Sequence, residues 1–254
     1  MERLKANYVK SKNELKREQK YRNKVEFMQN KRRQKRILKK TNKKSNRRAT
    51  PNEEQNNMKY TRRESLQLFR ENVAKSRFNI VFDLSFNNLM PERKINSLVN
   101  QMLYCYAENK RNFESPAKMI WTSFGSSVEK FVEQKKIDLD KWMIEKDARH
   151  WKDIFRSEDI VYLSPDAEEV LGEIEEEKVY VIGGLVDNGH EKNLTLDIAK
   201  ELGVSRKKFP VDQINKKNLV FTVNQTFEIL VKVFRGESWR ETIAEVFPKR
   251  KAKQ

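Results

Sequence analysis

Short apolar runs alternate with segments of helical periodicity between residues 78 and 247. Runs rich in β-branched and aromatic residues predict buried strands, at residues 78–82, 118–122, 160–163 and 179–182. Apolar residues at every third or fourth position predict helices, at residues 91–110, 126–136, 164–175, 196–202, 224–235 and 238–247. Strands that alternate with helices indicate an α/β fold, with a parallel sheet covered by helices on both faces.

The stretch at residues 179–192 combines a predicted strand with two glycines and an acid. Gly183 and Gly184 end the apolar run, and Asp187 follows three residues after the second glycine. Glycine adopts positive φ angles without strain and lets a ligand approach the backbone closely. In an open α/β sheet, ligands bind beyond the carboxyl ends of the strands. Taken alone, the stretch is more typical of a plain glycine turn closed by a capping aspartate; a ligand site beside one carboxylate is the alternative interpretation.

Three polar or aromatic residues near the predicted core are open to two interpretations. Gln101 lies three residues after Leu98, close to the inner face of the predicted helix at residues 91–110. A polar amide there is either a satisfied structural residue or part of a site. Trp142 and Trp151 follow in an irregular, charged segment. Tryptophan stacks on nucleobases, but we favour packing of both rings against the sheet.

The 54 basic and 37 acidic residues are unevenly distributed along the chain. Residues 1–77 contain 26 Lys and Arg and 8 Asp and Glu, whereas residues 78–254 contain 28 and 29. We therefore expect a basic N-terminal arm at residues 1–77 and an α/β domain with a basic tail at residues 78–254. The arm has too few apolar residues to offset the entropy of ordering. It is expected to be partly helical, around residues 13–40, or disordered.

The charge of the arm indicates a polyanionic partner. Each Lys or Arg placed beside a phosphate releases condensed counterions, so basic segments bind RNA or DNA. The candidate RNA-binding residues of the arm form one dense run: Lys31, Arg32, Arg33, Lys35 and Arg36. A nuclear import signal or a solvated tail is the alternative interpretation of the same charges.

The composition argues against several other classes of protein. No apolar run approaches the roughly 18 residues needed to span a bilayer, and no signal-peptide core follows Met1. Cys105 is the only cysteine, which excludes intrachain disulfides and favours a reducing compartment. With His150 and His190 as the only histidines, we expect no zinc-type cluster and no bound metal. Neither a Rossmann glycine motif nor a P-loop follows any predicted strand.

Five motifs, taken in order, resemble those of one enzyme family. They are FDLSFNNLM at residues 82–90, Gln101 followed by CYAENKR at 105–111, VYLSPD at 161–166, YVIGGLVD at 180–187, and TVNQ followed by FEIL at 222–230. Together they resemble the eukaryotic and archaeal tRNA (guanine-N1)-methyltransferases that modify the ninth nucleotide, a branch of the SPOUT class. The resemblance covers roughly residues 78–251.

The resemblance implies a fold, a cofactor and a partner. The expected fold is of the SPOUT type, with the carboxyl-terminal part of the domain threaded into a trefoil knot. We expect a monomeric enzyme that uses S-adenosyl-L-methionine as cofactor and tRNA as partner, and that does not bind a membrane. The expected compartment is the nucleus and/or the cytoplasm, rather than the mitochondrion. By motif, the cofactor contacts fall on Ser164, Gly184, Asn188, Gly189, His190, Glu191, Lys192, Leu196, Pro210, Val220, Phe221 and Thr222.

The resemblance also assigns catalytic positions. N1 of guanine carries a proton at neutral pH, so a general base and an in-line alignment of N1 with the methyl group would accelerate transfer. The acid of the family falls on Asp187. It acts either as this base, in which case burial must raise the pKa of the aspartate above its usual value of about 3.9, or as an acceptor that orients guanine. Asp83 and Gln101 are expected to hold the target base or its neighbours.

Other assignments stay open at this point. Lys110 and Arg111 are expected phosphate contacts, or else solvated charges. Two rival functions are N1-methylation of adenine at the same nucleotide and tRNA binding by a scaffold without catalysis. Because N1 of adenine has a free lone pair, the first rival would depend much less on Asp187 than guanine methylation does.

Overall fold

The computed structural model describes residues 60–186, 193–214 and 219–247, together with four helical residues of the arm, Gln19, Tyr21, Asn23 and Glu26. The chain divides into two compact units, residues 1–59 and residues 60–254. The boundary precedes the first helix of the second unit, whereas the sequence placed it at residue 77. All further elements belong to this second unit.

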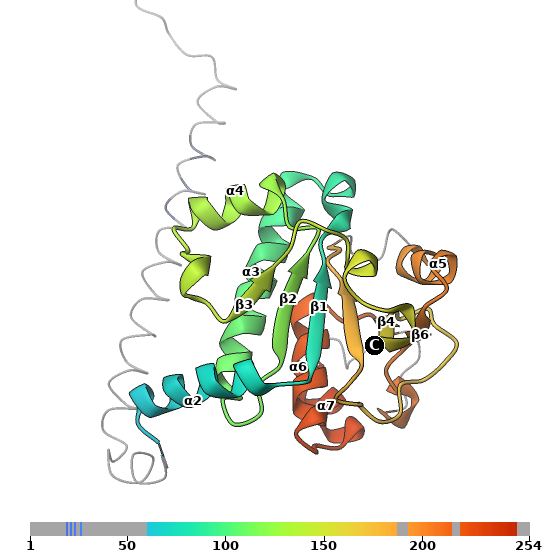
Figure 1. Ribbon diagram of the computed structural model, residues 1–254. Coiled ribbons are helices and arrows are strands. Elements are labelled where there is room, and N and C mark those ends of the chain that lie inside the picture. The colour runs from blue at the N-terminus through green and yellow to red at the C-terminus, as the bar shows by residue number, and fades with distance from the viewer. Residues whose placement is uncertain are drawn as a thin grey trace, which may run out of the picture. The chain divides into compact units, whose positions relative to one another are not determined.

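Six parallel strands form one sheet, in the order β3-β2-β1-β5-β4-β6 (Figure 1). The strands are β1 (Asn79–Asp83), β2 (Lys118–Thr122), β3 (Ile144–Lys146), β4 (Ile160–Leu163), β5 (Val179–Gly183) and β6 (Ser205–Lys207). The α-helices are α2 (Arg62–Lys75), α3 (Glu92–Arg111), α4 (Ser126–Gln134), α5 (Leu194–Glu201), α6 (Val223–Phe234) and α7 (Trp239–Val246). The predicted parallel α/β architecture is confirmed.

The strand order changes direction at the centre of the sheet. The chain runs outward from β1 through β2 to β3, then crosses to β4 and returns to place β5 between β1 and β4. A point where successive connections leave in opposite directions is where open α/β sheets bind ligands, beyond the carboxyl ends of the strands. The carboxyl ends of β1, β5 and β4 therefore form the expected location of a site.

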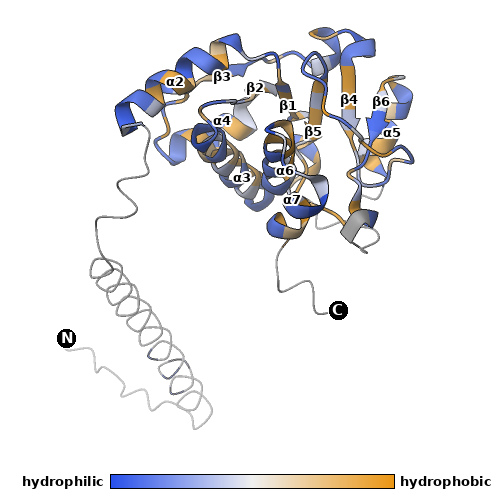
Figure 2. Cartoon of the chain, turned by 90° about the horizontal axis from the view of Figure 1, so that it is seen from below, coloured by the Kyte–Doolittle hydropathy of each residue, from blue (hydrophilic) through white to orange (hydrophobic). Residues whose placement is uncertain are grey.

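Two apolar clusters pack on the two faces of the sheet. The larger contains the inward side chains of α3, α4 and α6, which lie together on one face (Figure 2). Within it Phe82 of β1 stacks on Phe227 of α6, with ring centroids 5.9 Å apart. The smaller cluster covers the other face around Val81, Trp151 and Tyr162, and Ala199 of α5 packs there. The alternation of side chains along β1 divides neighbouring residues between the two faces.

One sequence-based prediction about the elements was wrong, and two short strands were missed. The predicted helix at residues 164–175 is a series of turns, closed by main-chain bonds between Leu171 and Lys208 and between Lys208 and Glu169. The short strands β3 and β6 were missed because each has only three residues and neither shows a clear apolar alternation. Helix α6 starts at Val223, one residue before the predicted range, and is capped by Thr222 through a capping box with Gln225.

No α-helix in the described part of the chain has both the length and the apolar character needed to cross a membrane.

A buried asparagine joins the end of α3 to the strand that follows it. The side chain of Asn109 donates to the main-chain oxygen of Ala117 and accepts from its nitrogen, both at 2.8 Å. We expect Asn109→Ala to lower the free energy of unfolding by about 2–5 kcal/mol, because two buried backbone groups lose their partner. Urea denaturation measures the loss. Asn100→Ala, at an exposed position of the same helix, is the control and should change stability by less than about 0.5 kcal/mol; equal losses in the two variants would contradict this role.

Candidate active site

Three neighbouring strands bring part of the predicted site together. Because β1, β5 and β4 are parallel, their carboxyl ends lie side by side and carry Asp83, the Gly183–Gly184 pair and Ser164. Asp83 is the direct partner of Gly183 in the strand register. The expected catalytic residue Asp187 and the expected cofactor contacts at residues 188–192 lie outside the described residues, as do the arm residues 31–36.

Asp83 is fully buried, and three groups donate hydrogen bonds to its carboxylate. Oδ1 accepts from the main-chain nitrogen of Ser85 at 3.0 Å. Oδ2 accepts from Trp151 Nε1 and from the Tyr162 hydroxyl, each at 3.0 Å. Burial raises the pKa of the Tyr162 hydroxyl well above its usual value, and the Asp83 carboxylate raises it further, so Tyr162 remains a donor at neutral pH. The expectation that Asp83 holds a target base stays a prediction, and the carboxylate is enclosed by protein groups.

The two glycines lie where side chains do not fit. A Cβ on Gly184 would be 2.6 Å from the main-chain oxygen of Asp83, which already accepts a hydrogen bond from Gly184 N at 2.8 Å. A Cβ on Gly183 would be 2.9 Å from Thr195 Cγ2 and 3.3 Å from the Tyr162 hydroxyl. Real Cβ atoms do not approach the backbone as closely as the first distance, so residue 184 must be glycine for β1 and β5 to pair here.

A second turn at this edge follows β4 and meets the start of α5. Ser164 is buried, its nitrogen donates to the main-chain oxygen of Lys207 at 3.1 Å, and its hydroxyl accepts from Thr195 Oγ1 at 2.9 Å. Asp166 Oδ2 accepts from the main-chain nitrogen of Asn193 at 3.1 Å. Asn193 has a φ of 61°, a left-handed conformation that asparagine tolerates better than most residues. The β4 turn thereby fixes the point where the chain enters α5.

Apolar residues expected at the cofactor lie around the same turn. Leu196 and Pro210 are buried, and Phe209 is packed between Phe221 and Trp239, with ring centroids 5.8 and 5.4 Å away. Thr222 caps α6 directly after Phe221. Val220 is 57% exposed and borders this group from the solvent side.

Gln101 lies on the other face of the sheet from the Asp83 carboxylate. It belongs to α3, whose inward residues pack in the larger cluster, whereas Asp83 binds Trp151 and Tyr162 of the smaller one. The buried Oε1 of Gln101 has no hydrogen-bond partner among the described residues. The structure therefore does not bring Gln101 and Asp83 together, and a role for Gln101 in holding a base stays a prediction.

Lys110 and Arg111 lie near the amino ends of the strands, whereas the glycine turn lies at the carboxyl ends. They end α3, and Asn109 beside them binds Ala117, immediately before β2 begins. Arg111 pairs with Glu108, and Lys110 Nζ lies 5.9 Å from the centre of the Tyr106 ring. Their assignment as phosphate contacts stays a prediction. The surface that carries them is remote from the candidate site.

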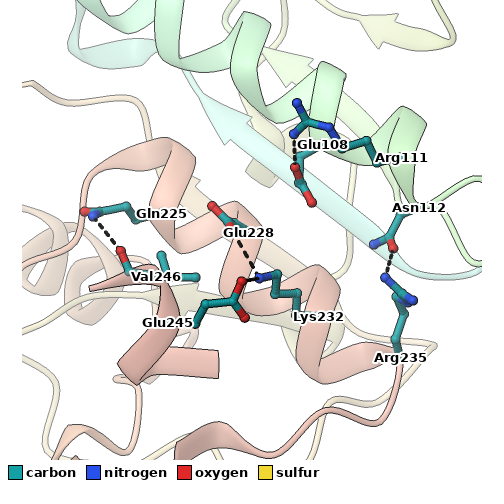
Figure 3. A network of polar contacts seen from close by, with 9 residues as sticks. All are labelled: Glu108, Arg111, Asn112, Gln225, Glu228, Lys232, Arg235, Glu245 and Val246. Carbon is teal, nitrogen blue, oxygen red and sulfur yellow. Dashed lines mark hydrogen bonds and ion pairs between the residues drawn. The ribbon is translucent and has the colours of Figure 1, made fainter. Parts of the chain in front are cut away.

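Polar contacts between α6 and its neighbours hold the helix in place (Figure 3). Lys232 binds Glu228 at 3.3 Å and Glu245 of α7 at 2.8 Å, and its side chain is only 12% exposed. Burial lowers the pKa of Lys232, but the two carboxylates outweigh burial and the pKa is raised. Arg235 donates to Asn112 Oδ1 at 2.6 Å, after the end of α3. The contacts thus anchor α6, whose cap is the expected cofactor residue Thr222.

Both tryptophans of the charged segment pack inside the domain. Trp151 is fully buried, and Trp142 stacks on Tyr106 with ring centroids 3.8 Å apart. Packing inside the domain is confirmed for both, against the sheet for Trp151 and against helix α3 for Trp142. Sequence reasoning did not identify the bond from Trp151 to Asp83, because 68 residues separate the two partners. The described residues contain no group of three or more His, Cys, Asp or Glu side chains placed to hold a metal ion.

Comparison with protein families gives one match over most of the chain. The family described as tRNA (guanine(9)-N(1))-methyltransferase TRM10/TRM10A matches residues 8–252. The chain is 38% identical over 194 residues to tRNA methyltransferase 10 homolog A of Xenopus tropicalis, covering 74% of this chain and 57% of the relative. It is 34% identical over 187 residues to the tRNA (guanine(9)-N1)-methyltransferase of Schizosaccharomyces pombe, covering 70% and 60%. The chain thus matches less than two thirds of the length of these relatives.

Solved structures agree with the fold. The crystal structure of full-length spTrm10 in complex with SAH has a TM-score of 0.62 at 30% identity, covering 68% of this chain and 96% of that one. A dual-specific Trm10 from Thermococcus kodakaraensis has a TM-score of 0.55 at 22% identity, covering 67% of this chain and 99% of that one. The second similarity concerns the fold alone.

The geometry of the glycine turn predicts that Gly184→Ala is disruptive. The new Cβ would lie 2.6 Å from a main-chain oxygen that cannot move without shifting β1. We expect a loss of about 1–3 kcal/mol in the free energy of unfolding, as for other overpacked sites, measured by urea denaturation. Gly172→Ala is the matched control, because a Cβ there meets nothing within 4 Å. A Gly184→Ala variant as stable as the Gly172→Ala variant would show that the strand pairing tolerates a side chain.

Proposed function

The chain belongs to the TRM10/TRM10A family of tRNA (guanine(9)-N(1))-methyltransferases, and from this premise we propose that it methylates N1 of guanine at nucleotide nine of tRNA. The observation that carries the proposal is the convergence of two tight turns, at Gly183–Gly184 and at Ser164, on the carboxyl edge of the sheet. The first of these turns leads directly to Asp187.

The residues around the β4 turn fit S-adenosylmethionine, the methyl donor that we propose. Leu196, Phe209 and Pro210 supply buried apolar surface for an adenine ring. Main-chain groups of the glycine turn and of the Ser164 turn supply hydrogen-bonding positions for the polar part of a nucleoside. When bound, this cofactor provides a methyl group already activated as a sulfonium.

Asp187 is the proposed acid that faces the guanine edge. Val186, the residue before it in the sequence, donates from its main-chain nitrogen to Met90 Sδ at 3.2 Å, so Val186 lies beside the turn before α3. As the base, a carboxylate there would take the N1 proton, which leaves the electron pair of the N–H bond on N1 for methyl transfer; as an orienting group, it would accept a hydrogen bond from N1–H. Only the base role requires a carboxylate, because the oxygen of a neutral amide accepts a hydrogen bond but does not remove the proton.

We also propose that residues 164–222 form the trefoil knot. After β6 the chain binds the segment that follows β4, through the main-chain bond from Leu171 to Lys208 at 2.8 Å. It then returns to α6, whose Phe227 packs against Phe82 of the central strand β1. A return path of this kind past an earlier loop supports threading, which is rare among protein folds.

The proposed tRNA partner is supported by the charge of the arm. Residues 1–59 contain 21 basic and 6 acidic residues, whereas residues 60–254 are close to neutral with 33 and 31. A basic segment of this kind binds the RNA backbone without regard to sequence, so the folded unit would supply the choice of nucleotide.

Transfer of a labelled methyl group tests the proposed reaction. We expect wild-type protein to methylate a tRNA with guanine at nucleotide nine. Asp187→Asn should lower kcat about 10²–10⁴-fold, the usual contribution of a general base. Asp197→Asn, at an exposed position in the first turn of α5, is the matched control and should leave kcat unchanged.

The same assay separates the rival functions. Transfer only to a tRNA with adenine at nucleotide nine, with little effect of Asp187→Asn, would replace guanine by adenine as the target. Binding of both tRNA and S-adenosylmethionine without any transfer would identify a scaffold. Folded protein with no affinity for S-adenosylmethionine would overturn the proposal.

Removal of residues 1–59 tests the role of the arm. The cut lies before Thr61, which caps α2 and belongs to the folded unit. We expect the KM for tRNA to rise at least about tenfold at physiological salt, and the dependence of binding on salt to become shallower, because fewer counterions are released. Calorimetry should give an unchanged affinity for S-adenosylmethionine. Full-length protein with glutamine at the dense basic run of residues 31–36 should show a smaller loss of the same kind; unchanged tRNA binding in both variants would exclude the arm.

A further inference from the structure

The hydroxyl of Tyr162 crosses one strand to reach Asp83. Tyr162 lies on β4, Asp83 ends β1, and β5 runs between them in the sheet. The path is open because residue 183 on β5 has no side chain; a Cβ at Gly183 would be 3.3 Å from the hydroxyl. The glycine, the tyrosine and the aspartate therefore form one arrangement that spans three strands.

Trp151 brings a second donor to the same oxygen, on the same face of the sheet as Tyr162. It belongs to the short 3-10 helix η3 (Trp151–Asp153), which follows the edge strand β3, and its Nε1 lies 3.0 Å from Asp83 Oδ2. The Trp151 and Tyr162 rings also touch, with centroids 5.5 Å apart. One carboxylate oxygen thus joins strand β4 to the 3-10 helix that follows β3 in the sequence.

The Asp83 carboxylate has neutral donors and no cation among its described partners. Burial of a carboxylate without a cation opposes folding, and an apolar residue of similar volume is often more stabilising at such a position. Conformational specificity is the property that a buried polar group provides in place of stability. Here the Asp83 carboxylate specifies the conformation of the end of β1.

The end of β1 in turn sets the glycine turn. The main-chain oxygen of Asp83 accepts from Gly184 N at 2.8 Å, so any displacement of Asp83 displaces Gly184. Gly184 lies three residues before Asp187. A change at Trp151 or Tyr162 is transmitted through one side chain and one main-chain bond to the segment that carries the acid.

We propose that Trp151 and Tyr162 are positioning residues, which hold the Gly183–Gly184 turn in register through the carboxylate of Asp83. The inference rests on the proposed methyl transfer for its effect on catalysis. Its effect on the turn itself is independent of that function. Both side chains are fully buried, so both act on kcat through the placement of the glycine turn.

Tyr162→Phe is the variant that tests this proposal, because it removes one hydroxyl and keeps the buried ring. We expect kcat to fall between about tenfold and a hundredfold, as for other small displacements of reacting groups, while the KM for tRNA stays within about twofold. Trp151→Phe removes the second donor and should lower kcat in the same way. Rates are taken per folded molecule, from the stoichiometry of S-adenosylmethionine binding.

Tyr180→Phe is the matched control. Tyr180 is equally buried, lies on the neighbouring strand β5, and its hydroxyl accepts from the main-chain nitrogen of Glu175 at 2.8 Å. The variant loses a tyrosine hydroxyl and its hydrogen bond without touching Asp83, so its kcat per folded molecule should remain that of wild type. An equal fall of kcat in Tyr180→Phe and Tyr162→Phe would reduce the effect to lost stability and overturn the proposal.

A double variant tests the route through Asp83. Asp83→Asn leaves a donor facing a donor, because Trp151 Nε1 and Ser85 N cannot accept hydrogen bonds. If Tyr162 acts through this carboxylate, Asp83→Asn combined with Tyr162→Phe should lower kcat no further than Asp83→Asn alone. Multiplication of the two single effects would show that Tyr162 acts by another route and would refute the proposal.

Hydrogen exchange keeps the proposal separate from the proposed function. The amide of Gly184 is bonded to Asp83, and in Tyr162→Phe it should exchange about tenfold faster than in wild type, with no change in Tyr180→Phe. A protein without methyl transfer but with this exchange pattern would refute the function and retain the positioning role. Wild-type exchange at Gly184 together with wild-type kcat in Tyr162→Phe would refute the positioning role alone.

Discussion

The close approach of β1 and β5 at their carboxyl ends is the constraint on which the site depends. The main-chain oxygen of Asp83 and the nitrogen of Gly184 are 2.8 Å apart, with no room for a Cβ between the strands. This contact turns the chain out of the sheet at the point where the strand order reverses. The side chain of the same aspartate is held by Trp151 and Tyr162, which fixes the position of the end of β1.

Periodicity identified the elements whose residues are buried on a regular pattern. The strands β1, β2, β4 and β5 and the long helix α3 lie close to their predicted ranges, because each presents several apolar residues to the core. It failed where tertiary bonds decide the conformation. Ala167 and Leu171 are four residues apart and both are buried, which predicts a helix, yet main-chain bonds to Lys208 and the Tyr180 hydroxyl hold the segment in turns.

The candidate site was predictable in location and less so in composition. A glycine pair after a strand correctly predicted the carboxyl edge of β5, since only the backbone conformation and local sequence are needed for that inference. The reason for the glycines was different: they make room for Asp83, Thr195 and Tyr162, which come from three other segments. The hydrogen bond from Trp151 to Asp83 was missed, because no local pattern distinguishes a tryptophan that only packs from one whose nitrogen also donates to a carboxylate.

The orientation of α3 limits what kind of RNA can contact both ends of the domain. The helix starts after β1, at the edge that carries the site, and ends at Lys110 and Arg111 near the amino end of β2. Its 20 residues span about 30 Å. Duplex rises about 3.4 Å per base pair, so phosphates at the two ends of α3 would be roughly nine base pairs apart. A flexible single strand that enters the site would lose conformational entropy by becoming ordered along the helix as far as Lys110, whereas a rigid duplex arm of a folded RNA covers that distance without this loss. Phosphate contacts at Lys110 and Arg111 would therefore favour a structured substrate over an unfolded one.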